Sequence, residues 1–189
     1  MNRTAPWPHP KAFILDRDGT LISHVPYLHD PDKIVLLPGV RDGLLQAVSA
    51  GVKLFLHTNQ SGVGRGYFTL EAVHACNRRL VELLDIGPAP FARICIASEA
   101  PDQSSRHRKP SPVFAEEVTR EFGFRREELW YLGDRGSDLK TAHAAGTNGA
   151  GIATGLDDLT AELAEAGLAG AYPIFSRFDL AVKHILGTS

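Results

Sequence analysis

The sequence has few cysteines, no excess of either charge and no long apolar run. Its two cysteines, Cys76 and Cys95, do not have the spacing of a disulfide framework, so we expect free thiols in a reducing compartment. The 20 Lys and Arg residues nearly balance the 22 Asp and Glu residues, which leaves no electrostatic footprint for nucleic acid. No apolar stretch approaches the length of a membrane span. These absences favour a cytoplasmic protein with a small-molecule partner.

The composition is that of one soluble globular domain. Of the 189 residues, 43% are hydrophobic and 22% are charged, close to the average for folded domains. The length fits one compact domain, so we expect residues 1–189 to form a single unit and to act as a monomer. Residues 1–10 are broken by proline and lack a basic end followed by an apolar stretch, so we expect a loosely ordered tail and no secretion signal.

Short apolar runs alternate with segments of helical periodicity. The runs predict buried strands, and glycine or proline marks the ends of several helices. This alternation predicts an α/β fold, a Rossmann-like, mostly parallel sheet sandwiched by helices, which binds ligands at the carboxyl ends of its strands. The strands are expected at 12–15, 52–56, 92–97, 130–132, 149–153 and 172–175, and the helices at 40–48, 69–84, 112–122, 139–145, 159–166 and the carboxyl end.

Carboxylates, a hydroxyl and an ammonium group follow the first four strands. Crowded carboxylates repel one another unless a cation neutralises them, and hard oxygen ligands suit Mg²⁺ better than zinc or copper. A hydroxyl and an ammonium group facing that cation would bind a phosphate group, which indicates phosphoryl transfer. The residues are Asp16, Asp18, Thr58, Asn59, Lys109, Asp134 and Asp138.

Four short motifs in this order resemble those of the haloacid dehalogenase superfamily. The resemblance covers about residues 12–155 and rests on Asp16-Arg17-Asp18-Gly19-Thr20-Leu21, Thr58-Asn59, Lys109-Pro110, and Gly133-Asp134 with Asp138. It implies the haloacid dehalogenase-like core. The intervals in which members insert a cap domain are short here, so we expect no cap domain and an open site.

The resemblance also implies a catalytic role for four residues. Asp16 would attack phosphorus and form an aspartyl-phosphate, and Asp18 would protonate the leaving oxygen and then activate water. Thr58 and Lys109 would stabilise the phosphoryl oxygens.

The metal ligands follow from the same resemblance. Mg²⁺ would be held by the carboxylates of Asp16 and Asp134 and by the backbone carbonyl of Asp18, with Asp138 supporting the site.

The loops are similar to those of one capless subgroup, which contains D-glycero-D-manno-heptose 1,7-bisphosphate 7-phosphatases and histidinol-phosphate phosphatases. We therefore expect a phosphatase acting on a small phosphorylated metabolite, foremost the heptose bisphosphate, with histidinol phosphate or another sugar phosphate as the alternative. The residues expected to contact substrate are Gly19, His24, Tyr27, Asn59, Arg65, Arg108 and Arg135.

The sequence departs from that subgroup in its metal clip. Members usually carry a Cys-x-His and Cys-x-Cys cluster before the third motif, where this chain has Ala97-Ser98-Glu99 and Ser105-Arg106-His107. Structural zinc sites normally use four Cys or His ligands, so we expect no structural zinc.

Two other classes of protein fit parts of the pattern. A phospho-acceptor signalling domain also combines acidic residues, Thr and Lys on an α/β sheet, but places its phosphorylated aspartate after a later strand. A non-catalytic phosphosugar-binding protein is the third hypothesis. Of the remaining polar residues, His57 is expected to be a hydrogen-bonded histidine at a strand edge, and Trp130 and Tyr131 are expected to pack in the core.

Overall fold

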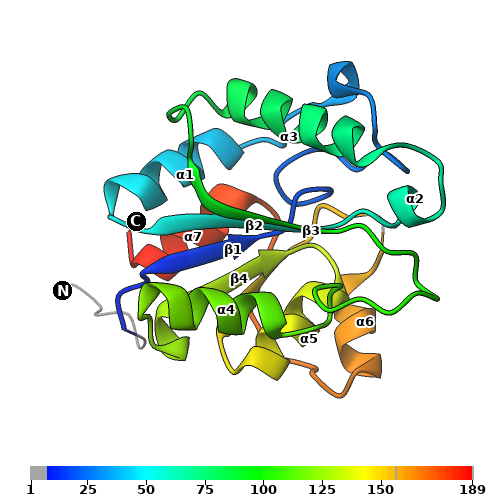
Figure 1. Cartoon of the computed structure of the whole chain (residues 1–189). Helices are drawn as coiled ribbons and strands as arrows, with labels where there is room; N and C mark the ends of the chain where they lie inside the picture. Colours follow the sequence, from blue (N-terminus) through cyan, green and yellow to red (C-terminus); the bar gives the residue numbers. More distant parts are fainter. Residues whose placement is uncertain (1–7, 156, 189) are drawn as a thin grey trace.

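The computed structural model describes residues 8–155 and 157–188. Most of the expected loosely ordered tail, residues 1–10, therefore lies outside the described residues. Within the described part, strands and helices alternate along the chain (Figure 1). The strands are β1 (Ala12–Leu15), β2 (Lys53–Asn59), β3 (Phe91–Ala97), β4 (Leu129–Gly133), β5 (Asn148–Ile152) and β6 (Ile174–Phe175). The α-helices are α1 (Val40–Ser49), α2 (Ser61–Gly64), α3 (Leu70–Leu84), α4 (Val113–Phe122), α5 (Gly136–Ala145), α6 (Leu159–Glu165) and α7 (Phe178–Leu186).

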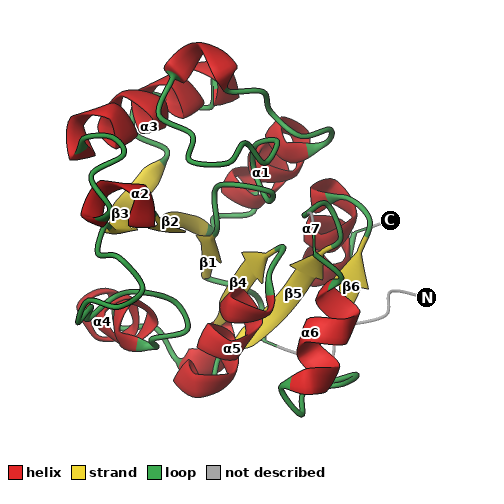
Figure 2. Ribbon diagram, turned by 90° about the vertical axis from the view of Figure 1, so that its right-hand side faces the viewer, coloured by secondary structure: helices red, strands yellow, loops and turns green. Residues whose placement is uncertain are grey.

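The six strands form one sheet in the order β3-β2-β1-β4-β5-β6, and each neighbouring pair is parallel. Helices α1, α3 and α7 lie on one face of the sheet, and α4, α5 and α6 lie on the other (Figure 2). The predicted α/β sandwich is confirmed. Strand order reverses beside β1, so the carboxyl ends of β1, β2 and β4 open onto the crevice where such sheets bind ligands.

Strand β1 is buried on both faces, as its apolar run predicts. Phe13 and Leu15 pack into the core under α1, α3 and α7, while Ala12 and Ile14 pack against α4 and α5. This alternation follows from the two-residue period of a strand. With no side chain of β1 free to face solvent, its position in the sheet is strongly fixed.

Two elements are longer than the sequence pattern indicates. Strand β2 continues through His57 and Thr58 to Asn59, because the parallel pairing with β3 continues to that residue. Helix α5 begins at Gly136 rather than near Leu139, since the Asp138 carboxylate accepts a hydrogen bond from the Arg135 amide and closes the first turn. Both extensions carry polar residues, which apolar periodicity does not detect.

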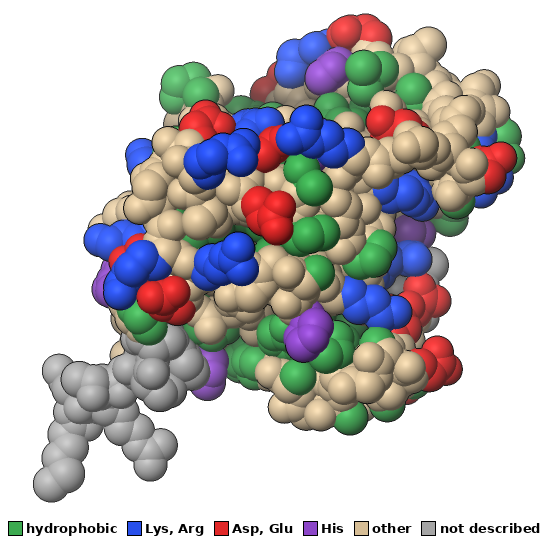
Figure 3. All heavy atoms as spheres, turned by 60° about the horizontal axis from the view of Figure 1, so that its bottom comes forward, with side chains coloured by type: hydrophobic (Ala, Val, Ile, Leu, Met, Phe, Trp, Pro, Cys, Tyr) green, Lys and Arg blue, Asp and Glu red, His purple; other side chains and the backbone are tan. Residues whose placement is uncertain are grey.

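The surface below the sheet, on the side of α4, α5 and α6, carries basic and acidic side chains that are interspersed (Figure 3). In the part of the chain that the structure describes, no helix has the length and apolar character needed to cross a bilayer.

His57 does not lie at an exposed edge, which corrects the expectation from sequence. It is fully buried, because residues of the 98–112 segment cover the end of β2; its Nε2 donates to the His107 carbonyl at 2.7 Å, and its Nδ1 accepts from the Tyr131 hydroxyl. Trp130 and Tyr131 are buried, as predicted. Burial, followed by the positive charge of Lys109, lowers the pKa of His57 to about 3, against the opposing hydrogen bond to His107.

This burial predicts a loss of stability in mild acid. Below pH 6.5 the unfolded chain protonates His57 but the folded protein does not, so unfolding becomes easier by up to about 1.4 kcal/mol per pH unit until the folded pKa is reached. Urea unfolding of the wild type and of His57→Asn, measured between pH 7.5 and 4.5, should show that the free energy of unfolding falls less steeply with decreasing pH in the variant. Equal slopes would contradict a neutral, buried His57.

Candidate active site

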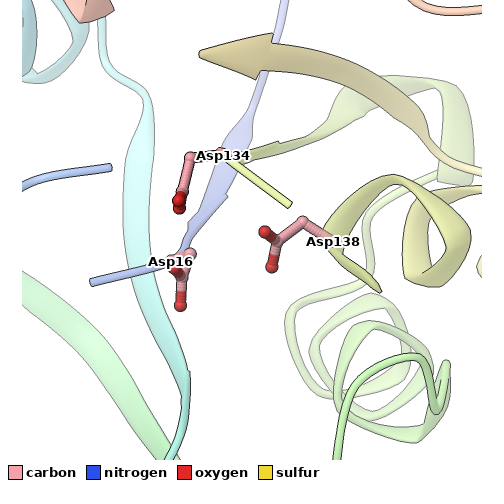
Figure 4. Close-up of side chains that lie close together, drawn as sticks. All are labelled: Asp16, Asp134 and Asp138. Carbon is pink, nitrogen blue, oxygen red and sulfur yellow. The ribbon is translucent and has the colours of Figure 1, made fainter. Parts of the chain in front are cut away.

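Three buried aspartates point toward one another at the carboxyl edge of the sheet (Figure 4). Asp16 follows β1, Asp134 follows β4, and Asp138 lies in the first turn of α5. One carboxylate oxygen from each lies within 4.8 Å of the other two. The sequence predicts that these residues meet, and the structure places them together because β1 and β4 are adjacent parallel strands. Such a cluster is stable only with a compensating cation.

Lys109 supplies one positive charge to this cluster. Its Nζ lies 2.5 Å from Asp16 Oδ1 and 2.6 Å from Asp138 Oδ1, and its side chain is 3% exposed. Burial favours the neutral amine, but the two carboxylates outweigh that effect and hold the pKa of Lys109 above its usual range. The pKa of Asp138 is still raised, to about 6, by burial and by the charge of Asp16. Lys109 therefore compensates two of the three carboxylates.

Asp134 has no such cation. Its Oδ1 accepts from the Thr20 hydroxyl at 2.8 Å, but its buried Oδ2 has no hydrogen-bond partner among the described residues. Burial, together with Asp16 and Asp138, raises the pKa of Asp134 to about 8.

Two glycines surround the unpartnered Oδ2 of Asp134. A side chain at Gly19, where φ is +88°, or at Gly155 would overlap this carboxylate. The space beside Asp134 is therefore kept free by two residues that lie far apart in the sequence.

Asp18 is held in place by the side chains of two residues. The fully buried Arg17 donates from Nε and Nη2 to the Asp18 carboxylate at 3.0 and 3.2 Å, and Gln60 Nε2 donates to it at 2.8 Å. Arg17 is anchored in turn by Asn77 of α3 at 2.9 Å, and Gln60 also donates to the Thr58 hydroxyl at 2.9 Å. These contacts fix the carboxylate at the wall of the cavity.

Asn59 fixes the backbone of Lys109. The Asn59 amide nitrogen donates to the Lys109 carbonyl at 3.2 Å, and its oxygen accepts from the Lys109 amide at 3.0 Å. The end of β2 thereby holds the segment that delivers the ammonium group.

A cavity of about 420 Å³ opens above these residues. Among the residues predicted from sequence, those that line it are Asp16, Asp18, His24, Tyr27, Thr58, Asn59, Arg108, Lys109 and Arg135. Asp134 and Asp138 lie beneath its floor, and Gly19 lies in the turn next to Asp134. Arg65 departs from the expectation, because it is exposed at the end of α2 and does not line the cavity.

Several residues of the site were not predicted from the sequence. Gln60, which donates to Asp18, directly follows the Thr58-Asn59 motif, and this position could have indicated it. Arg17 lies inside the first motif, yet nothing in its type indicates a fully buried partner of Asp18. Gly155 reaches the site from the loop after β5, and only the fold reveals that.

The residues at the positions of the subgroup's metal clip make other contacts. Glu99 accepts from the Ser105 hydroxyl at 2.7 Å, and His107 faces Glu117 at 3.2 Å. Cys95 is buried in the core, and burial raises the pKa of its thiol to about 11.

Comparison with known proteins agrees with this site. The family described as "HAD-hyrolase-like" matches residues 106–178. The chain is 31% identical over 153 residues to the D-glycero-beta-D-manno-heptose-1,7-bisphosphate 7-phosphatase of Pseudomonas putida, covering 80% of this chain and 87% of the relative. It is 32% identical over 141 residues to the Histidine biosynthesis bifunctional protein HisB of Legionella pneumophila, covering 73% of this chain but only 40% of that relative.

A solved structure extends the likeness to the fold. The D,D-heptose 1.7-bisphosphate phosphatase from B. bronchiseptica, complexed with magnesium and phosphate, aligns with a TM-score of 0.83 and 26% identity, over 93% of this chain and 98% of that one. The chain therefore belongs to the haloacid dehalogenase-like hydrolases. Within them it belongs to the family of phosphatases that includes the D-glycero-beta-D-manno-heptose-1,7-bisphosphate 7-phosphatases.

Removal of the Lys109 charge should destabilise the fold. Lys109→Met leaves Asp16 and Asp138 buried without their cation, and breaking such a buried pair costs about 3–5 kcal/mol. Urea unfolding at pH 7 with a chelator present should show this loss. The double variant Lys109→Met/Asp138→Asn should recover part of it, because one buried charge is then removed. A single variant as stable as the wild type would contradict the role of Lys109 as the compensating charge.

Proposed function

We propose that this protein is a Mg²⁺-dependent phosphatase that hydrolyses D-glycero-D-manno-heptose 1,7-bisphosphate through an aspartyl-phosphate on Asp16. The observation that carries the proposal is the placement of Asp16 at the cavity floor, with Lys109 on one side and Asp18 at the wall. The names of its relatives, which include both heptose-bisphosphate phosphatases and an enzyme of histidine biosynthesis, support this class of substrate.

The reaction needs a nucleophile and a proton donor. A carboxylate oxygen of Asp16 attacks phosphorus while the bond from phosphorus to the ester oxygen breaks, and Asp18 gives its proton to that leaving oxygen. In the second half, Asp18 takes a proton from a water molecule that attacks the same phosphorus. Phosphate leaves and Asp16 is regenerated.

Other residues hold the phosphoryl group. The Lys109 ammonium and the Thr58 hydroxyl face the cavity beside Asp16 and would donate to phosphoryl oxygens. Arg17 and Gln60 donate to the Asp18 carboxylate and keep it at the wall of the cavity.

The site fits Mg²⁺. Its donors are carboxylate oxygens, which a hard cation prefers, and the unpartnered Oδ2 of Asp134 lies beside the space kept free by Gly19 and Gly155. We infer that Asp16, Asp134 and the backbone carbonyl of Asp18 hold the ion, while Asp138 orients Lys109. When bound, Mg²⁺ neutralises charge on the phosphoryl oxygens and on the facing carboxylates.

The outer cavity favours a second anionic group on the substrate. Arg108 and Arg135 line it, together with His24 and Tyr27. Arg135 is already paired with Asp157 at 3.3 Å, which leaves Arg108 as the cation available to the substrate. A guanidinium group matches phosphate well, which supports a bisphosphate over histidinol phosphate, whose amine would meet this cation. Action as a monomer in the cytoplasm remains a prediction.

Mg²⁺ should stabilise the folded protein, and Gly155→Ala should abolish that effect. The added methyl group would overlap Asp134 and occupy the space beside Oδ2. At 100 times its dissociation constant, an ion that binds only the folded state adds about 2.7 kcal/mol. Thermal melts with and without MgCl₂ measure this rise. The magnesium-free melts control for any direct effect of the variant on the fold, and an equal rise in Gly155→Ala would contradict the site.

Phosphate release from a panel of substrates tests the reaction. With Mg²⁺, the wild type should prefer one anomer of D-glycero-D-manno-heptose 1,7-bisphosphate over histidinol phosphate, fructose 1,6-bisphosphate and p-nitrophenyl phosphate. Asp16→Asn should lose at least about 10³-fold in rate, because the covalent route is removed. If the wild type binds these substrates without turnover, the protein is a phosphosugar-binding protein and the proposal is wrong. If it accumulates a stable aspartyl-phosphate, it is a signalling domain.

A further inference from the structure

The segment 98–112, between β3 and α4, presents Arg108 and Lys109 to the cavity although it contains no helix or strand. A segment without regular secondary structure keeps its shape only through specific contacts. The contacts that fix Arg108 differ from those that fix Lys109. This difference gives a role to Glu117, a residue that does not line the cavity.

Glu117 of α4 is the centre of a group of contacts that includes two residues of this segment. Its side chain is 11% exposed, and two arginines and one histidine surround it. Arg106 Nη2 lies 2.9 Å from Oε1, His107 Nε2 lies 3.2 Å from Oε1, and Arg93 Nη2 lies 2.8 Å from Oε2. Two of these partners belong to the segment and one belongs to β3. Glu117 therefore joins the segment to the edge of the sheet and to a helix.

The order imposed at residues 106 and 107 passes directly to Arg108. The Arg108 amide donates to the Ser105 hydroxyl at 3.1 Å, and its guanidinium donates to the Glu99 carbonyl at 3.3 Å. Ser105 in turn donates to the Glu99 carboxylate at 2.7 Å. Among the described residues, the hydrogen bonds of Arg108 are thus all made with its own segment, which Glu117 contacts through Arg106 and His107.

Lys109 is held independently of Glu117. Asn59 binds both backbone groups of Lys109, and its ammonium group is paired with Asp16 and Asp138. A change at Glu117 therefore affects the two cations differently: it frees the side chains of Arg106 and His107 next to Arg108, where the bond from His57 to the His107 carbonyl remains, while every contact of Lys109 described above is kept.

We propose that Glu117 is a positioning residue that orders the 105–108 segment and thereby directs Arg108 toward the part of the substrate beyond the transferred phosphoryl group. The kinetic part of this proposal rests on the proposed function. Consistent with tight pairing, the hydrogen bonds from His107 and Arg93 hold the pKa of Glu117 below its usual range although burial acts in the opposite direction.

The chain offers a matched control on the same helix. Glu121 lies one turn further along α4 and pairs with the same Arg93 at 3.1 Å, but its side chain is 54% exposed and no contact joins it to the described residues of the 98–112 segment. Glu117→Gln and Glu121→Gln each remove one negative charge that faces Arg93. Only the first removes the partner of Arg106 and His107. Glu117→Asp keeps the charge and serves as the conservative variant.

Hydrogen exchange gives a readout that does not depend on activity. In Glu117→Gln, exchange of the Arg108 amide, which donates to the Ser105 hydroxyl, should be at least about tenfold faster than in the wild type, because the segment opens locally. Trypsin should also cleave faster after Arg106. Glu121→Gln should match the wild type, and Glu117→Asp should recover part of the protection. Equal exchange in the Glu117→Gln and Glu121→Gln variants would overturn the proposal.

Kinetics separate positioning from chemistry. With heptose 1,7-bisphosphate and Mg²⁺, Glu117→Gln should raise KM about tenfold and change kcat less than about threefold, since Lys109 stays in place. With p-nitrophenyl phosphate, which has no second phosphate, KM should not change. A loss confined to kcat, or an unchanged KM for the bisphosphate, would overturn the role of Glu117 in positioning Arg108. An inactive wild type would instead refute the proposed function, and exchange would still decide whether Glu117 orders the segment.

Discussion

The site depends on one interaction, the ammonium group of Lys109 lying between the carboxylates of Asp16 and Asp138. The parallel order of β1 and β4 forces acidic residues together at the floor of the crevice, where burial makes their charges costly. No residue of the sheet itself supplies a cation at that point. The charge comes from a segment without helix or strand, so the shape of that segment is a condition for the stability of the cluster and not only for catalysis.

This condition explains why buried polar residues surround the segment. His57 donates to the His107 carbonyl, and Asn59 brackets the backbone of Lys109. His57 and Asn59 both lie in the last three residues of β2. On the other side of the segment, Glu117 pairs with Arg106 and His107. The segment that carries Lys109 is thus held by hydrogen bonds and ion pairs from two elements of regular structure, β2 and α4, and none of these contacts among the described residues fixes both Lys109 and Arg108.

Much of this could be read from the sequence, for a physical reason. Apolar runs such as 12–15 and the start of a helix near residue 69 are local signals, and the structure confirms both, with Thr69 capping α3 by accepting from the Ala72 amide. The meeting of Asp16 with Asp134 followed from the rule that parallel strands end at one edge. Arg17 and Gly155 could not be predicted, because the role of Arg17 depends on Asn77, 60 residues away, and that of Gly155 depends on how the loop after β5 returns to Asp134. The same holds for His57, whose burial depends on a segment that apolar periodicity does not describe.

The open crevice leaves substrate selection to two loops that contact one another. Tyr27, in the loop after β1, packs edge-on against Tyr67 with ring centroids 4.9 Å apart, and His29 stacks on Phe68 at 5.4 Å. Tyr27 and Phe68 also line the cavity. Aromatic pairs of this kind contribute about 0.5–1.5 kcal/mol beyond the effect of the area that they bury, and these two pairs hold the loops against each other. The cavity is therefore bounded by an aromatic wall on this side and by Arg108 on a separate segment. In the proposed reaction, a substrate that reaches both surfaces carries an anionic group at a distance from the phosphate that Asp16 would attack, and this requirement distinguishes a sugar bisphosphate from a simple phosphate ester.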